Sequence, residues 1–154
     1  MKIIKKFISI SCLVLFFSLS FSGCWGDGES VGDFFWAVDF QTEPNKYYKV
    51  YASLFKEGTY CSIYIEDSER GSISDSAADN LINEFDNQIY PKLTTKFGTE
   101  SDVDGNGKII LLILDIKDSY NTDKSGGYYA GYFDPINLYS NTFINPHSNE
   151  CDMI

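Results

Sequence analysis

Three runs in the first half of the chain are rich in aromatic and β-branched residues, the composition of β-strands. They cover residues 34–40, 47–55 and 60–65. Turn-forming segments around Pro44 and Gly58 separate them. In the third run Cys61, Ile63 and Ile65 occupy every second position. We therefore expect these three side chains to share one face of a strand.

A four-residue repeat of apolar side chains then predicts an amphipathic helix. The repeat consists of Leu81, Phe85, Ile89, Leu93 and Phe97, with Ala78 and Ile82 beside it. Ser76, followed by Asp79 three positions later, has the pattern of an N-terminal capping pair, so the helix is expected to begin near residues 74–76. Pro91 predicts a kink or a fresh helical start, and Gly98 predicts the C-terminal stop.

The second half of the chain opens with a nearly continuous apolar run over residues 109–116, which predicts a strand buried on both faces. Residues 128–133 predict a further strand or hairpin arm, and the chain from residue 134 onward has the composition of a loop. The strand, helix, strand order over residues 60–116 is typical of an α/β core. We expect an α/β (α+β) fold, with a small β-rich N-terminal part followed by this core.

The N-terminus combines a short positive region, an apolar run over residues 7–21 and the small residues Ser22 and Gly23 before Cys24. This order is that of an export signal, and the run is short for a spanning helix, which needs roughly 20 apolar residues. It resembles a bacterial lipoprotein signal, although Phe21 stands where Leu is usual. The interpretation is a signal peptide over residues 1–23, lipid on Cys24, a tether over 24–33 and one domain over 34–154. An ordinary cleaved signal or an N-terminal anchor helix is the alternative.

The net charge of the chain without its signal peptide argues against some classes of binding partner. Removal of residues 1–23 takes away three lysines and leaves 9 basic against 22 acidic residues, a net charge of −13. Such a chain repels nucleic acid and anionic lipid surfaces. It suits a protein exported to the bacterial cell envelope and held at a membrane by its lipid anchor, and it suits cation binding. The sequence does not identify a protein or peptide partner.

Two cysteines remain after Cys12 and Cys24 are assigned to the signal and the lipid site. Cys61 and Cys151 could form a disulfide in an oxidising compartment. Equally, Cys61 could be a small buried hydrophobic side chain, since it alternates with isoleucines. The sequence leaves both alternatives open.

The sharpest local motif is Asp102-Val103-Asp104-Gly105-Asn106-Gly107-Lys108. It matches the first half of an EF-hand-like calcium loop, with oxygen side chains at positions one, three and five and glycine at six. Asp102, Asp104 and Asn106 would bind calcium, with the Lys108 carbonyl as a fourth ligand. Position twelve is Ile113 rather than glutamate, so Glu100, Asp115 or Asp134 would complete the site. The alternative is a turn that only leads into the next strand.

Zinc is not supported by the sequence. The chain has one histidine, His147, and no HExxH motif, so the usual two-histidine zinc helix cannot form. His147 and Cys151 could offer two ligands only if that stretch were helical, and Pro146 argues against it. We expect His147 to be a solvated surface residue and assign no catalytic residue.

The order of segments resembles the region ahead of the active site in the hyicolysin family of secreted zinc metallopeptidases. The residues that carry this resemblance are Phe35–Phe40, Tyr60–Asp67, Phe85-Asp86, Ile89-Tyr90-Pro91, Phe97-Gly98, Asp102–Lys108, Leu114-Asp115-Ile116, Gly131–Tyr139 and Ser148-Asn149-Glu150.

The resemblance implies an exported protein whose strands and helix form the upper half of a zincin-like fold. In that family the zinc helix follows soon after a stretch like residues 149–154, where this sequence stops. We therefore expect a domain cut before its catalytic helix and inactive alone. A free-standing calcium-binding surface lipoprotein, acting as a binding module, is the alternative.

Overall fold

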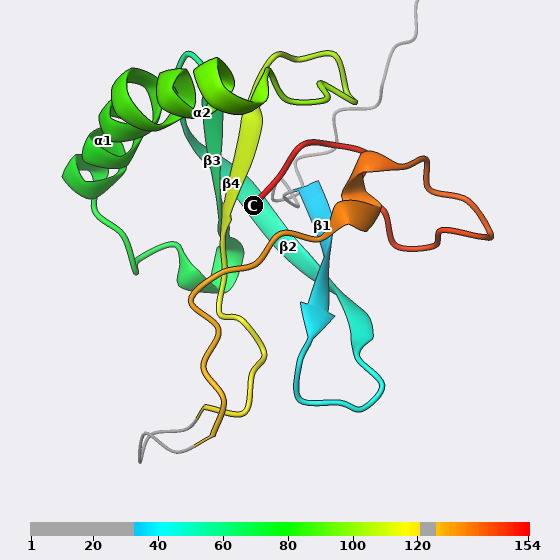
Figure 1. The fold of residues 1–154 in the computed structure, drawn as a ribbon. Coiled ribbons are helices and arrows are strands. Elements are labelled where there is room, and N and C mark those ends of the chain that lie inside the picture. The colour runs from blue at the N-terminus through cyan, green and yellow to red at the C-terminus, as the bar shows by residue number, and fades with distance from the viewer. Residues whose placement is uncertain (1–32, 121–125) are drawn as a thin grey trace, which may run out of the picture.

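The structure is a computed structural model that describes residues 33–120 and 126–154. Four strands form one curled sheet in the order β1-β2-β3-β4, and a helical layer lies against one of its faces (Figure 1). The strands are β1 (Asp33–Asp39), β2 (Lys46–Glu57), β3 (Cys61–Glu66) and β4 (Ile109–Ile113). This mixed architecture confirms the expected α/β (α+β) fold class.

The first three strands are antiparallel neighbours, whereas β3 and β4 are parallel. A parallel pair needs a crossover connection, and here the helical layer supplies it. The outer side of β4 pairs with the chain's last residues through a parallel bridge from Ile110 to Met153. β4 is therefore flanked on both sides, but it ends three residues before the predicted strand did. Its side chains Ile109, Leu111 and Ile113 are only half-buried, although Leu111 and Ile113 pack under the helical layer.

The helical layer consists of α1 (Asp75–Glu84), a π-helical turn η2 (Phe85–Ile89) and α2 (Tyr90–Phe97). Ser74 caps α1, because its side chain accepts a hydrogen bond from the Ala77 backbone N–H; the predicted Ser76 cap was wrong. Pro91 lies in the first turn of α2, as expected for a fresh helical start. Gly98 ends α2 with a φ of 88°, a conformation that favours glycine.

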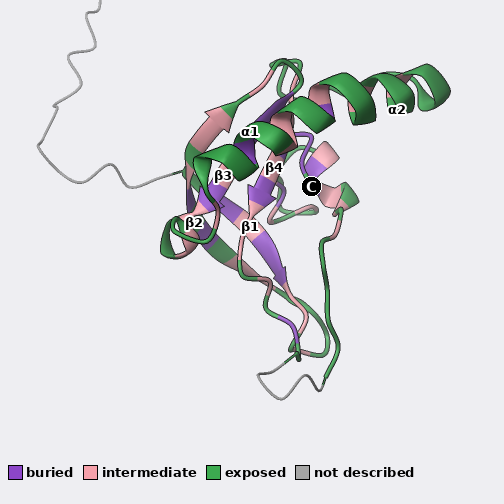
Figure 2. Ribbon diagram, turned by 90° about the vertical axis from the view of Figure 1, so that its left-hand side faces the viewer, coloured by how far each residue is buried: buried purple, intermediate pink, exposed green. Residues whose placement is uncertain are grey.

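The core consists of one apolar cluster on each face of the sheet. In Figure 2 the buried residues lie mainly along the strands. On the helical face, Ile63 and Ile65 of β3 pack with Ala78 of α1, and all three are fully buried. The cluster on the other face consists of Phe35, Ala52, Ile110, Leu112, Cys151 and Met153. The alternation predicted for β3 is thus confirmed, since its odd-numbered side chains point to the helices.

Residues 128–133 form no strand, contrary to prediction. Their polar groups make single contacts instead of a strand ladder. The Tyr129 N–H donates to the Asp118 carboxylate, and the Tyr132 hydroxyl accepts from the Val38 backbone N–H. The remaining chain runs through a short 3₁₀ turn η3 (Pro135–Leu138) and back to β4. Aromatic composition therefore indicated packing against β1 here, not strand pairing.

The signal peptide, Cys24 and most of the predicted tether lie outside the described residues. Within residues 33–120 and 126–154, no helix has the length and apolar character needed to cross a membrane. The predicted boundary at residue 34 is close to the start of β1 at Asp33.

Candidate functional site

The predicted calcium loop connects the helical layer to β4. Asp102, Gly105 and Gly107 all have positive φ angles, of 48°, 71° and 66°. Glycine reaches these angles without strain, and aspartate tolerates them better than most residues. The two glycines therefore allow the chain to wrap tightly enough to bring side chains one, three and five of the motif to one turn.

Hydrogen bonds within the loop hold these oxygen atoms in place. Asp102 Oδ1 accepts from the Gly107 N–H at 2.7 Å, and Asn106 Oδ1 accepts from the Lys108 N–H at 2.6 Å. Asp104 accepts from Asn106, through the backbone N–H at 3.4 Å and the side-chain amide at 2.5 Å. A cation that used both Asp104 and Asn106 would have to displace this side-chain contact.

The three candidates for the missing ligand do not all lie near the loop. Glu100 precedes it, and both of its carboxylate oxygens accept from the Tyr90 hydroxyl, at 3.0 and 2.8 Å. Asp115 follows β4 at the end opposite to the loop, and Asp134 begins η3 and accepts from the Tyr47 hydroxyl. Within the part of the chain that is described, no three His, Cys, Asp or Glu side chains gather as a metal-binding group.

Two other acidic residues contact the loop, and sequence reasoning missed both: Glu57, which pairs with the Lys108 ammonium at 3.1 Å, and Asp152. The buried carboxylate of Asp152 accepts from the Ser101 N–H at 3.2 Å and from the Val103 N–H at 2.9 Å. Fifty residues of intervening chain hide this contact from any local pattern. The structural role of Asp152 is to fix the start of the loop to the segment that pairs with β4.

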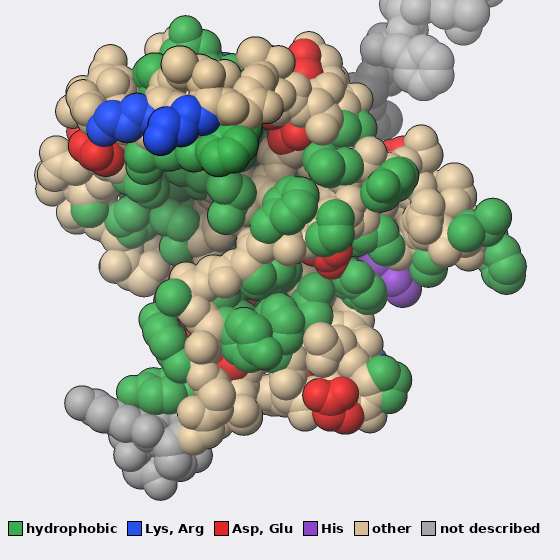
Figure 3. Space-filling view, in the orientation of Figure 1, with side chains coloured by type: hydrophobic (Ala, Val, Ile, Leu, Met, Phe, Trp, Pro, Cys, Tyr) green, Lys and Arg blue, Asp and Glu red, His purple; other side chains and the backbone are tan. Residues whose placement is uncertain are grey.

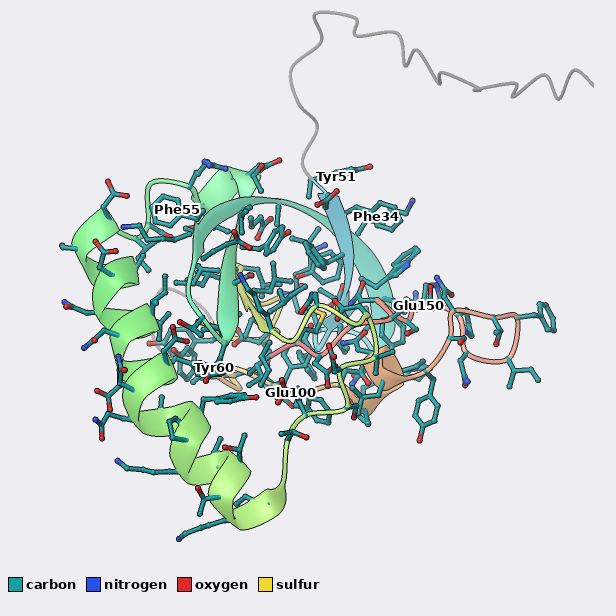
Figure 4. The ribbon with its side chains drawn as sticks, turned by 90° about the horizontal axis from the view of Figure 1, so that it is seen from above. Phe34, Tyr51, Phe55, Tyr60, Glu100 and Glu150 are labelled. Carbon is teal, nitrogen blue, oxygen red and sulfur yellow. The ribbon has the colours of Figure 1, made fainter. Side chains whose placement is uncertain are left out.

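Glu100 also belongs to an aromatic contact at the start of α2. Tyr60 and Tyr90 stack with their ring centroids 4.1 Å apart, and Figure 4 shows Tyr60 and Glu100 between the helical layer and the loop. The hydrogen bond to Glu100, followed by desolvation, raises the pKa of Tyr90 to about 12. Tyr90 is therefore a neutral hydrogen-bond donor at physiological pH.

Cys61 and Cys151 are both free and buried. The Cys61 thiol lies on the helical face, 3.9 Å from Asp86 of η2, whereas Cys151 belongs to the cluster on the opposite face. The two thiols therefore contact opposite faces of the sheet, and both are free in the structure. Burial is also the main cause that raises the pKa of Cys61 to about 11 and of Cys151 to about 12.

His147 is not the solvated side chain that the sequence suggested. Its ring stacks on Tyr47 at 4.9 Å and meets the edge of Trp36 at 4.4 Å. The stretch from His147 to Cys151 is not helical, so these two residues do not form the pair considered above. The histidine packs the segment after η3 against the β1–β2 hairpin.

An apolar hollow of about 420 Å³ lies along the outer edge of β4. Its lining comes from α1, from the end of β4 and from the segments around residues 130–137 and 153–154. In Figure 3 a band of hydrophobic side chains occupies the surface below the helix. Ile89 at the end of η2 and Leu93 and Phe97 of α2 add further apolar surface, with exposed fractions of 37, 49 and 81 %. We call these three residues the α2 ridge.

No known protein-family profile matches this sequence. The chain is 38 % identical over 119 residues to the neutral metalloprotease ShpI of Staphylococcus hyicus. The matched region makes up 77 % of this chain and 25 % of that protein, so the chain spans about a quarter of its relative's length. This similarity supports a metallopeptidase-like region, which is the coarser part of the expectation from sequence.

Proposed function

We propose that this chain is a membrane-anchored, exported part of a metallopeptidase-like protein that supplies binding surface and no catalytic group. The observation that carries the proposal is the 38 % identity over 119 residues to a neutral metalloprotease. Export and anchoring rest on the signal-like N-terminus, with lipid on Cys24 as the attachment to the membrane.

Inactivity of the chain by itself follows from its residue inventory. A zinc peptidase of the HExxH type needs two histidines one helical turn apart, and His147 is the sole histidine of this sequence. The contacts of His147 with Trp36 and Tyr47 also occupy its ring in packing. The chain lacks both the metal ligands and the general base of that mechanism.

The binding surface consists of the hollow along β4 and the α2 ridge. Monomeric proteins rarely expose large contiguous apolar patches, and those that do generally use them as interaction sites. A chain that matches a quarter of a longer peptidase has such surfaces available for further polypeptide of a metallopeptidase-like protein.

A peptidase assay tests the inactive part of the proposal. The purified chain, supplied with zinc and calcium, is incubated with casein beside the S. hyicus neutral metalloprotease as positive control. We expect no hydrolysis above the protein-free blank. Chelator-sensitive hydrolysis by the chain alone would overturn the proposal.

The intact mass of the protein from its own cells tests anchoring. A mass that equals residues 24–154 plus lipid supports attachment through Cys24. A Cys24→Ser variant should lose the lipid mass and its membrane fraction together. Unmodified protein in the culture medium would contradict the anchor and leave the metallopeptidase-like part untouched.

Calcium binding by the loop at Asp102, Asp104, Asn106 and the Lys108 carbonyl is a second candidate function, that of a calcium-dependent binding module. The specific observation in its favour is that three side-chain oxygens and two positive-φ glycines lie in one turn. Oxygen is the ligand that a hard cation prefers, so the residues present fit calcium better than zinc.

A calcium titration of the thermal unfolding midpoint tests this second candidate. A ligand that binds only the folded state stabilises it by about 2.7 kcal/mol at a concentration of 100 Kd. We expect the midpoint to rise with calcium in the native chain and not in Asp102→Ala/Asp104→Ala. Asp75→Ala, which removes an exposed carboxylate on α1, is the matched control and should keep the shift. An equal shift in all three proteins would show nonspecific ion binding.

A further inference from the structure

The segment after η3 forms a projecting loop with a closed base. At this base the Cys151 N–H donates to the Asn137 carbonyl at 3.0 Å, and the Ser148 hydroxyl donates to the Tyr139 carbonyl. The Asn141 N–H donates to the Glu150 carboxylate at 3.0 Å. The loop extends away from the sheet in Figure 1, and Figure 4 shows Glu150 near its base. We call residues 139–148 the projecting loop.

The tip of the projecting loop is a turn with two large apolar side chains. The Thr142 N–H donates to the Asn145 carbonyl, and the Asn145 N–H donates back to the Thr142 hydroxyl. Phe143 and Ile144 occupy the two central positions, with exposed fractions of 102 and 86 %. Hydrophobic side chains form the outermost end of this loop in Figure 3. The turn therefore presents both side chains to whatever lies beyond it.

The sequence around the tip is free of charged side chains, and the nearest carboxylate is that of Glu150 at the base of the loop. Residues 135–149 contain no Asp, Glu, Lys or Arg, in a chain of which 22 % is charged. Tyr139, with an exposed fraction of 60 %, and several Asn, Ser and Thr residues flank the tip. An apolar tip with a tyrosine and uncharged polar groups around it has the composition of a segment at a membrane–water boundary, because no charge must be desolvated there.

The base of the projecting loop is attached to β1, the strand closest in sequence to Cys24. Asn149 bonds to both polar groups of the Trp36 backbone, at 2.7 and 2.9 Å. Trp36 lies 12 residues after Cys24, and Phe143 lies 6 residues before Asn149. Extended chain spans at most about 3.3–3.6 Å per residue, so these lengths reach up to roughly 40 and 20 Å. One flat surface can therefore meet both the lipid site and the tip.

The size of the tip favours a lipid surface over a second protein. Two large apolar side chains offer on the order of 400 Å², whereas a stable protein interface buries about 800 Å² on each partner. A bilayer needs no complementary pocket, so a small convex wedge can be buried in it. The acyl chains on Cys24 would supply the attachment itself, and a second apolar contact would slow dissociation further and fix the orientation of the domain.

We propose that Phe143 and Ile144 insert into the bilayer that holds the acyl chains on Cys24. The inference rests on the proposed anchoring at Cys24 and adds a second contact to it. The contact is with the acyl boundary of an uncharged lipid surface, since the acidic chain is repelled by anionic headgroups. The wedge would hold the sheet and the calcium loop in one orientation above the membrane.

Fluorescence quenching in vesicles tests the wedge. Lipidated full-length chain with Phe143→Trp is reconstituted into phosphatidylcholine vesicles with brominated acyl chains. The matched control is Phe97→Trp, which places the same probe at the exposed end of α2. We expect quenching of the Phe143→Trp probe to exceed that of the Phe97→Trp probe at least threefold, after subtraction of the native tryptophans. Equal quenching at both positions overturns the wedge.

Two further proteins separate the wedge from the anchor. Phe143→Ser/Ile144→Ser changes only exposed positions, and we expect it to keep its lipid mass while dissociating from vesicles at least fivefold faster. Absence of lipid on the native chain defeats the anchoring proposal, whereas lipid with an unquenched tip defeats the wedge alone. A concentration-dependent blue shift of the Phe143→Trp probe without vesicles would indicate contact between two copies and also overturns it.

Discussion

The two halves of the helical layer carry the same apolar repeat but have different surroundings. In the first half, Ala78 is buried against the helical face of the sheet with Leu81 and Ile82 half-buried beside it, and Phe85 is buried as well. In the second half, the exposed fraction of the α2 ridge rises along the helix and reaches 81 % at Phe97. A repeat of apolar residues therefore identifies one face of a helix, but it does not say how far that face is covered.

The π-helical turn between the halves accounts for the change. A π-helical turn holds one more residue than an α-helical turn, so side chains four apart no longer stay in one line across it. In Figure 2, α2 also continues beyond the strands that α1 covers. Because the strands do not extend under α2, the ridge has no sheet to pack against, and its side chains are exposed at the surface.

Truncation of one phenylalanine in each half should give the largest difference in stability. Phe85→Ala opens a cavity under a side chain that is 5 % exposed, and we expect it to lower the free energy of unfolding by about 3–5 kcal/mol. Phe97→Ala removes an exposed ring and should change it by less than about 0.5 kcal/mol. Urea denaturation followed by circular dichroism measures both. Similar losses in the two variants would mean that the ridge is packed in solution.

Substitution of Gly58, in the turn before β3, should destabilise the fold because an added β-carbon meets closely packed neighbours, although less than Phe85→Ala does. A β-carbon at Gly58 would lie 2.7 Å from Asp86 Oδ2 and 2.7 Å from Ile82 Cγ2. Asp86 cannot move freely, because it accepts from the Thr59 and Tyr60 N–H groups. We expect Gly58→Ala to lower the free energy of unfolding by about 1–3 kcal/mol.

Gly71→Ala is the control for Gly58, since a β-carbon there meets no atom within 4 Å. It should leave the free energy of unfolding unchanged or raise it by up to about 1 kcal/mol. The same urea titration compares the two variants. A neutral Gly58→Ala would show that Ile82 and Asp86 are looser than their contacts indicate.

The smallest expected effect is a pH dependence of the free energy of unfolding, caused by Tyr90 at the junction between the two halves. The pKa of Tyr90 is raised from 10.0 to about 12 in the folded chain, first by its hydrogen bond to Glu100. A raised pKa means that the stabilising contribution is complete below pH 10 and is lost as the pH rises toward 12. We expect the urea midpoint of Tyr90→Phe to fall less between pH 9 and pH 11.5 than the midpoint of the native chain does. Tyr139→Phe, at an exposed position, should behave as the native chain does.

The strands and the helix could be predicted from sequence because each depends on neighbours a few residues away. Alternation of Cys61, Ile63 and Ile65 indicated one face of β3, and all three are 0 % exposed. Pro91 and Gly98 indicated where α2 starts and stops because each residue restricts or permits particular backbone angles. The strand predicted over residues 128–133 was wrong, because aromatic side chains are as common in a packed loop as in a strand.

The candidate site was less predictable because its supports come from distant parts of the chain. The Asp102–Lys108 motif predicted a tight loop, and the structure has the positive φ angles of such a loop at Asp102, Gly105 and Gly107. Nothing local to Asp152 indicated that its carboxylate would bind the start of that loop. Similarly, the contact of His147 with Tyr47 brings together residues 100 positions apart, and composition alone favoured solvent exposure.

The amide of Asn149 has a consequence for solubility. An edge strand with free N–H and C=O groups invites another strand to pair with it, which is a common route to aggregation. On β1 the Asn149 side chain accepts from the Trp36 N–H and donates to the Trp36 carbonyl, as a neighbouring peptide group would. The Tyr132 hydroxyl occupies the next outward N–H, that of Val38. Two side chains thus occupy the outward groups of Trp36 and the outward N–H of Val38, so that this stretch of β1 is a poor template for a strand of another copy.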